Sequence, residues 1–164
     1  MSMLNTMTRY KAWANQLTFA SLQDLPEDEV SKTRPTAFKN MLNTLSHTYV
    51  VDHIFQAHLE GRPHHYTARN TSTPPPLSEL WQQVTALDQW YIDYAAALSP
   101  AQQDERIRFQ FIGGGEGVMS RGEMILHVVN HATYHRGFVA DMMYQIPAKP
   151  PTTDLPVFLR DVAQ

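Results

Sequence analysis

Apolar residues recur at helical spacing through four long segments of the chain, and polar stretches separate these segments. From Leu4 to Leu22 most apolar positions lie three or four residues apart, the spacing that lines one face of a helix. The same pattern predicts three further long helices, from Thr36 to Gly61, from Leu77 to Leu98, and from about Ser120 to Tyr144. A proline and an acidic cap predict one more short helix that begins at Asp154.

The connections between these segments have patterns of their own. Residues 64–76 are polar and end in three prolines, which predicts a surface loop that crosses over the other elements. Polar and apolar residues alternate over 106–111, and glycines follow at 113–115, so a small β-hairpin is expected before the last long helix. Together these features predict an all-α fold, a four-helix bundle with one crossover and a hairpin, in a single domain over residues 1–164.

Composition restricts the chemistry. The 164 residues include eight histidines and no cysteine. Disulfides, iron–sulfur clusters, thiolate zinc sites and a cysteine nucleophile are therefore excluded, and a transition metal would need histidine and carboxylate ligands. The net charge is -3, the pI is near 6.2, and the basic residues are scattered, so no nucleic-acid partner is expected. The first 15 residues lack the apolar stretch of a signal peptide and no segment is long and apolar enough for a membrane span, so we expect a cytoplasmic protein with no membrane partner.

The most informative segment runs from His127 to Gly137 and contains three histidines. Four residues advance a helix by about 400°, so His131 and His135 project from one side, about one turn apart. Two imidazoles placed in this way can bind one metal ion. His127 extends the same stripe, but three histidines along two turns span about 12 Å, so one ion does not easily take all three.

A third ligand is therefore expected from another helix, and His47 is the best placed. It lies among apolar residues of the second predicted helix, whereas His53 and His58 lie nearer its loop end, and His64 and His65 belong to a polar loop. The alternatives stay open at this point, because a histidine pair four residues apart also occurs without metal, and a single core histidine is more often structural. The metalloprotease signature H-E-x-x-H is not met, because no glutamate lies between His131 and His135. His127 is either a packing residue or a hydrogen-bond partner of a ligand, and Asp52, Asp141, Asn43 and Asn130 are further candidates for that second role.

Three segments of the chain resemble the DinB family, which is related to the YfiT-like metal-dependent hydrolases. The segments are Tyr10–Asn15, Leu45–Asp52 and His127–Gly137, and Thr153–Leu155 near the end also matches. The resemblance implies a four-helix bundle of up-down-down-up topology, a homodimer, and one divalent metal ion held by His47, His131 and His135. Phe138 departs from the pattern, because many members have glutamine after His-Arg-Gly.

Characterised relatives look like thiol-dependent transferases and isomerases. The expected function is therefore that of a divalent-metal-binding, metal-dependent enzyme that transfers a low-molecular-weight thiol to an electrophilic small-molecule substrate. A metal-dependent hydrolase of an amide or ester and a non-catalytic, metal-binding stress-response dimer are the alternatives. Imidazole suits several ions, so zinc, nickel, iron and manganese all remain candidates. No residue can be assigned a catalytic role from spacing alone.

Overall fold

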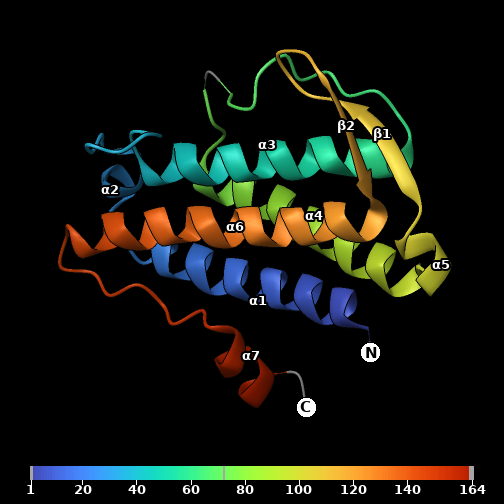
Figure 1. Ribbon diagram of the computed structural model, residues 1–164. Coiled ribbons are helices and arrows are strands. Elements are labelled where there is room, and N and C mark those ends of the chain that lie inside the picture. The colour runs from blue at the N-terminus through green and yellow to red at the C-terminus, as the bar shows by residue number, and fades with distance from the viewer. Residues whose placement is uncertain (1, 72, 163–164) are drawn as a thin grey trace.

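The structure is a computed structural model that describes residues 2–71 and 73–162; residue 72 and the ends of the predicted domain, residues 1 and 163–164, lie outside the described part. The described residues are mostly helical and include one antiparallel sheet of two strands. Four long helices lie side by side (Figure 1). They are α1 (Met3–Gln23), α3 (Met41–Glu60), α4 (Leu77–Ala97) and α6 (Arg121–Tyr144).

The long helices surround a shared apolar core. Helix α1 packs against α4 and α6, and α3 packs against α6 and α4. One part of the core lies beneath the hairpin, and a second part lies at the opposite end of the helices, where α2 (Glu27–Ser31) covers it. Each part combines residues from at least three of the long helices, so burial of apolar surface joins segments that are distant in sequence.

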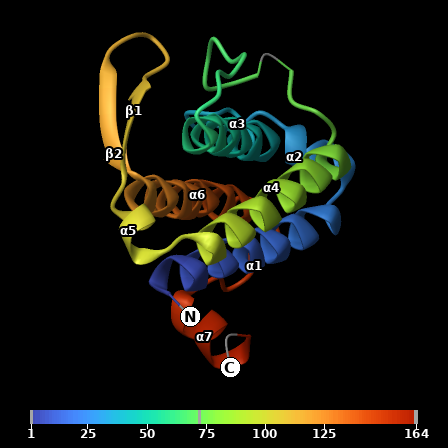
Figure 2. The same ribbon diagram turned by 90° about the vertical axis from the view of Figure 1, so that its right-hand side faces the viewer.

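The C-terminal helix α7 (Leu155–Asp161) docks against the outer side of α1 (Figure 2). Phe158 is buried there and contacts the rings of Tyr10 and Trp13. The hydroxyl of Tyr10 also donates a hydrogen bond of 2.8 Å to the Thr153 carbonyl. These contacts confirm the expected short last helix and explain why aromatic residues occur on the α1 side that faces away from α4.

The start of α3 differs from the expectation. Thr36 does not cap this helix, because residues 36–40 form a loop in which Lys39 has a left-handed φ of 68°. The cap is Asn40, whose side-chain oxygen accepts a hydrogen bond of 2.7 Å from the Asn43 backbone N–H. The expected end is confirmed, since Gly61 closes the helix with φ of 67°. The pattern did not predict the short helices α2 and α5 (Pro100–Gln103), which contain too few residues to show a period.

The predicted hairpin is confirmed. Strands β1 (Arg106–Gln110) and β2 (Glu116–Ser120) pair antiparallel, and glycines 113–115 all adopt positive φ in the connecting turn. Phe109 lies opposite Gly117, is buried, and packs against Phe55 and His58 of α3. The hairpin thus covers the C-terminal end of α3 (Figure 2).

The polar segment after α3 forms the predicted crossover. Residues 62–71 and 73–76 run back over α3 and lead into the start of α4 (Figure 1). This path places Arg69, Asn70 and Thr71 above the middle and first part of α3, where the histidines of interest lie. Among the described helices, none combines the length and the apolarity that a membrane crossing requires.

Candidate metal centre

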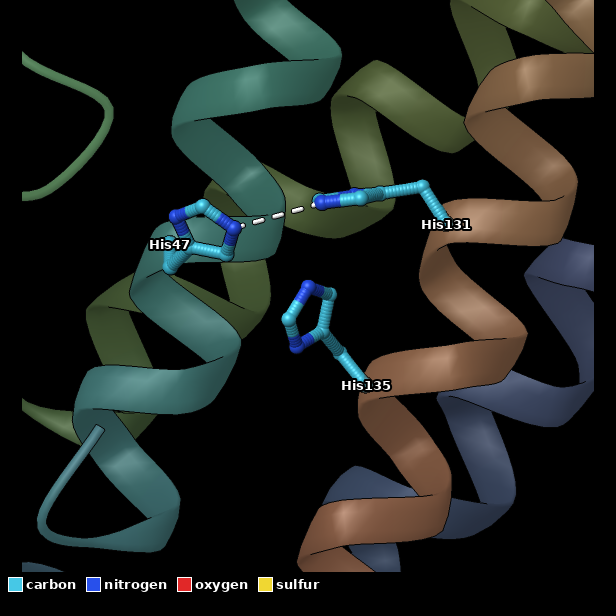
Figure 3. Close-up of side chains that lie close together, drawn as sticks. All are labelled: His47, His131 and His135. Carbon is cyan, nitrogen blue, oxygen red and sulfur yellow. Dashed lines mark hydrogen bonds between the residues drawn. The ribbon is translucent and has the colours of Figure 1, made fainter. Parts of the chain in front are cut away.

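The structure brings together the three histidines that the sequence singled out. His131 and His135 project from one side of α6, one turn apart, and His47 faces them from α3 (Figure 3). One ring nitrogen of each residue lies within 4.8 Å of a ring nitrogen of the other two. In the described part of the chain, this is the group of histidine and acidic side chains whose ligand atoms come close enough to hold a metal ion.

The spacing of the nitrogens suits a common ligand. The Nε2 atoms of His47 and His131 are 3.2 Å apart. Two nitrogens bound tetrahedrally to zinc at about 2.0–2.1 Å would be separated by about 3.3–3.4 Å. The His47–His131 pair is thus close to ligand spacing, and the group of three histidines could hold a metal ion.

Local structure fixes the helix that carries two of the three histidines. At the start of α6, the Ser120 hydroxyl accepts a hydrogen bond from the Glu123 N–H, and the Glu123 carboxylate accepts one from the Ser120 N–H. This reciprocal cap satisfies backbone donors that a helix start leaves free. The buried apolar residues of α6 then set the side of the helix that faces α3.

The crossover loop orients His47. Its Nδ1 atom lies 2.9 Å from the carbonyl oxygen of Arg69. A carbonyl only accepts hydrogen bonds, so Nδ1 carries the proton and Nε2 keeps its lone pair toward His131. The Nδ1 atoms of His131 and His135 are buried and have no protein hydrogen-bond partner. In the described structure, protein hydrogen bonds through Nδ1 therefore orient His47 but not the other two rings.

Electrostatics favour the neutral imidazoles that metal binding requires. Burial, together with the like charges of the neighbouring His135 and His47, lowers the pKa of His131 to about 3. Burial and His47 likewise lower the pKa of His135 to about 4. Burial also lowers the pKa of His47, although the Arg69 carbonyl and the Asn70 side chain oppose this shift through hydrogen bonds. Near neutral pH all three rings are therefore uncharged, which is the ligand form.

Phenylalanine rings lie against two of the three histidines. Phe38, from the loop before α3, stacks on His47 with ring centroids 4.5 Å apart and meets His135 edge-on at 5.1 Å. Phe138, the residue that departs from the family pattern, lies beside His135 with a centroid distance of 6.0 Å. It therefore lines the site with an apolar ring where glutamine would place an amide.

The remaining histidines lie outside the group. His127 stacks on His131 and packs against Phe55, so it acts as a packing residue. His53 pairs with the Tyr66 hydroxyl at 2.8 Å, and His58 contacts His64 edge-on. In the polar loop, His65 is exposed and His64 is half-buried.

A buried ionic network supports α6 from the side of α1. Lys11 is only 1% exposed and pairs with Asp52 of α3 at 2.8 Å and with Asp88 of α4. Burial opposes the charge on Lys11, but the two carboxylates outweigh it and raise the lysine pKa. Asn15 donates to Asp88 at 2.9 Å and accepts from Arg136, the residue after His135, at 3.0 Å. The network thus joins all four long helices next to the histidines.

Two cavities flank His47 along α3. The first, of about 250 Å³, lies toward the start of the helix, and we call it the amide pocket; it is lined by Ala37, Phe38, Lys39, Asn43, Asn70 and Thr71. The second, of about 50 Å³, lies toward the end of the helix, and we call it the apolar cleft; its lining includes Val51, Ile54, Phe55, His58, Phe109 and Phe111. Since Asn43, His47 and Val51 are spaced by four residues, they share one face of α3.

The sequence did not reveal several residues that shape the site. Lys11 lies four residues after Met7 and three before Ala14, within the buried stripe of α1, and this charged residue in an apolar stripe was the available signal. Phe38 had been assigned to a helix, and Arg69 acts through a backbone carbonyl, which no side-chain pattern reports. Of the proposed partners for the imidazoles, Asp52 pairs with Lys11, Asn43 lines the amide pocket, and Asp141 and Asn130 are exposed.

Comparison with known proteins agrees with these features. The chain is 29% identical over 161 residues to a protein named Protein DinB from Bacillus subtilis (strain 168), and the match covers 92% of this chain and 90% of that protein. Residues 1–162 match the model of the DinB family. This match includes all three histidines and the residues of the buried network. The chain therefore belongs to the DinB family.

Proposed function

We propose that His47, His131 and His135 bind one divalent metal ion and that the protein is a metal-dependent transferase of low-molecular-weight thiols. The observation that carries the proposal is the approach of three buried or half-buried imidazoles, from two helices, to within 4.8 Å of one another. Three neutral imidazoles leave the charge of a divalent ion uncompensated and leave room for a further ligand. Zinc, nickel, iron and manganese all suit such a donor set.

The chemistry that the ion supplies when bound is Lewis acidity, which lowers the pKa of a thiol or a water in its open position. The residues of the chain do the rest. The Arg69 carbonyl holds the proton on Nδ1 of His47, and Phe38 shields the rings of His47 and His135 from water. Asp52, the buried carboxylate of this part of α3, is paired with Lys11 and is thus less available as a base for hydrolysis.

The two cavities support a reaction between two substrates. The amide pocket is polar and the apolar cleft is largely hydrophobic, and they lie on opposite sides of His47 along α3. We propose that the thiol occupies the first and that an apolar group of the electrophile enters the second. In the transfer, the thiol loses its proton to solvent and its sulfur forms a bond to the electrophilic carbon. The leaving group departs from that carbon with the bonding electrons.

Metal content tests the ligand assignment. We expect the purified protein to contain about one divalent ion per chain and His131→Ala to lose it, because two imidazoles rarely retain an ion that needs three. His65→Ala, an exposed loop histidine, is the matched control and should retain the ion. Unchanged metal content in His131→Ala would refute the assignment.

Thiol dependence tests the reaction. The metal-loaded protein is incubated with 1-chloro-2,4-dinitrobenzene, with and without glutathione, and with 4-nitrophenyl acetate. Release of chloride that needs both protein and glutathione supports transfer. Ester cleavage without thiol would identify a hydrolase instead. No turnover, together with a fourth protein ligand that closes the metal site, would identify a non-catalytic metal-binding protein.

We also infer the up-down-down-up topology. The course of the chain in Figure 1 supports it, since α3 and α4 run in one direction while α1 and α6 run in the other. The long crossover over residues 62–76 is the connection that such an order requires, because two successive parallel helices cannot be joined by a short turn.

A homodimer is the assembly that we propose. On α6, Leu126, Tyr134 and Tyr144 are 44%, 63% and 70% exposed, so this helix presents large apolar side chains to solvent. These side chains are the part of α6 that a second copy of the chain could bury. Light scattering after size-exclusion chromatography should give twice the chain mass, and Tyr134→Lys should lower it. A monomer at all concentrations would refute the dimer.

A further inference from the structure

We propose that the amide pocket binds a carboxylate of the thiol substrate, so that the protein selects thiols that carry an acidic group. This inference rests on the proposed thiol transfer and adds the chemical feature by which the thiol is recognised. It concerns the cavity lined by Ala37, Phe38, Lys39, Asn43, Asn70 and Thr71.

The amide pocket adjoins the three histidines. Its wall is Phe38, whose ring contacts His47 and His135 directly. Asn70 directly follows Arg69, whose carbonyl accepts the hydrogen bond from His47. The Asn70 side chain interacts with that histidine as well. Asn43 lies one helical turn before His47 on α3, a rise of about 6 Å. A small molecule can therefore place its sulfur at the histidines and a second polar group in the pocket.

The polar lining of the pocket favours an anion. Lys39 supplies a positive charge, Asn43 and Asn70 supply amide N–H donors, and Thr71 supplies a hydroxyl, while none of the described residues that line the cavity has a carboxylate. Asn43 also belongs to the first turn of α3, where the positive end of the helix dipole favours negative charge. Ammonium and amide donors around one oxygen-bearing anion make charge-assisted hydrogen bonds, which are roughly twice as strong as neutral ones.

The backbone at Lys39 is held in a conformation that suits this role. Lys39 has φ of 68°, the left-handed region, and it is the residue other than glycine that adopts positive φ in the described part of the chain. This conformation is unfavourable for a residue with a Cβ atom. Hydrogen bonds hold it, because the Lys39 carbonyl accepts from the Arg34 N–H at 2.6 Å and its N–H donates to the Thr36 carbonyl at 3.1 Å. Strain kept in this way commonly marks a binding residue, and here it places the lysine at the pocket.

Phe138 and Phe38 limit the other places for a charged group. Both rings lie beside His135, and an anion against them would lose hydration without gaining donors. The apolar cleft on the other side of His47 is also unsuited to a carboxylate, although Arg69 lies at its border. Of the two cavities that flank His47 along α3, the amide pocket is thus the one that compensates a negative charge.

A pair of thiols that differ only in charge tests the proposal. The protein is loaded with Co²⁺, and 6-mercaptohexanoate or 6-mercaptohexan-1-ol is titrated while the sulfur-to-cobalt charge-transfer band reports binding. We expect the carboxylate to bind about tenfold more tightly or better, as charge-assisted hydrogen bonds typically contribute. In Lys39→Asn and in Asn43→Ala this preference should fall to about twofold. Asparagine tolerates the left-handed backbone at position 39, so the first variant removes the charge without adding strain.

Lys149→Asn is the matched control, because it removes the same charge from an exposed lysine outside the pocket lining. It should keep the full preference for the carboxylate. Equal affinity of the parent protein for the two thiols would overturn the carboxylate pocket while leaving thiol transfer intact. Failure of both thiols to produce the band would overturn thiol transfer itself, together with the inference that depends on it.

Discussion

Arg136 donates a hydrogen bond of 3.0 Å to the side-chain oxygen of Asn15, across 121 positions of the sequence. Arg136 directly follows His135, so this contact ties the helix of two candidate metal ligands to α1. Its second guanidinium nitrogen donates to Thr133 at 2.9 Å, which restricts the side chain further. The rotation of α6 about its axis, and with it the direction of both histidines, is thereby coupled to the buried network around Lys11.

Loss of the lysine charge should destabilise the fold strongly. Lys11→Met leaves the buried carboxylates of Asp52 and Asp88 without their cation. Breaking a buried ion pair by removal of one partner typically costs about 3–5 kcal/mol of unfolding free energy. Urea denaturation of the metal-free protein measures this loss. The exposed Lys149→Met should change stability by less than about 0.5 kcal/mol.

Neutralisation of the stranded carboxylates separates charge from packing. In the Lys11→Met background, Asp52→Asn and Asp88→Asn should restore a large part of the lost stability, because an amide is less costly to bury than an unpaired charge. If the triple variant is no more stable than Lys11→Met alone, the network contributes through shape and not through charge.

The metal-free protein should lose stability as the pH falls below about 6.5. The unfolded chain protonates its imidazoles near that pH, whereas burial keeps the pKa of His131 at about 3 and that of His135 at about 4. At pH values between these folded-state pKa values and the unfolded value of about 6.5, the unfolded state therefore binds more protons than the folded state. Each histidine contributes a slope of at most about 1.4 kcal/mol per pH unit, full stability being present above the unfolded pKa.

Denaturant titrations of the metal-free protein at several pH values between about 7 and about 5 measure this slope. His131→Gln removes one of these titrating groups and should make the slope smaller, while the other groups, such as His47 and Asp52, are present in both proteins. Parallel curves for the parent protein and His131→Gln would show that His131 is not held neutral by the fold.

Added metal should stabilise the folded protein, by an amount that grows with the logarithm of the metal concentration above its dissociation constant. A ligand at a hundredfold excess over its dissociation constant adds about 2.7 kcal/mol when it binds only the folded state. The melting temperature of the parent protein should therefore rise with Zn²⁺ and fall again with a chelator. His47→Ala should show no such rise, and an equal rise in that variant would place the bound ion elsewhere.

A methyl group at Gly117 should disturb the hairpin. A Cβ atom there would lie 2.7 Å from Cε1 of the buried Phe109 ring, which packs against α3. Overpacking of this kind costs about 1–3 kcal/mol. Gly137→Ala is the control, since its Cβ would meet nothing within 4 Å on the exposed side of α6. That change should be neutral or stabilise the helix by up to about 1 kcal/mol, and thermal unfolding compares the two.

The apolar period was sufficient to find the long helices, since each buries a face over some five turns. It was insufficient at the start of α3, where Thr36 and Asn40 are both good caps. The left-handed Lys39, which no local propensity predicts, decides between them. The grouping of His47 with His131 and His135 followed from helical spacing combined with the family resemblance. The Arg69 carbonyl could not be predicted, because any residue has a carbonyl and only the path of the crossover brings this one to His47.

That backbone contact has a consequence for how proteins of this kind can diverge. The acceptor that orients His47 belongs to the main chain, so a change of side chain at position 69 leaves it in place. The adjacent position 70 contributes its side chain to the amide pocket. Point mutations in the crossover can thus alter which ligand the amide pocket binds without changing the orientation of the His47 imidazole. Insertions or deletions in this loop, by contrast, would shift the carbonyl and the pocket wall together.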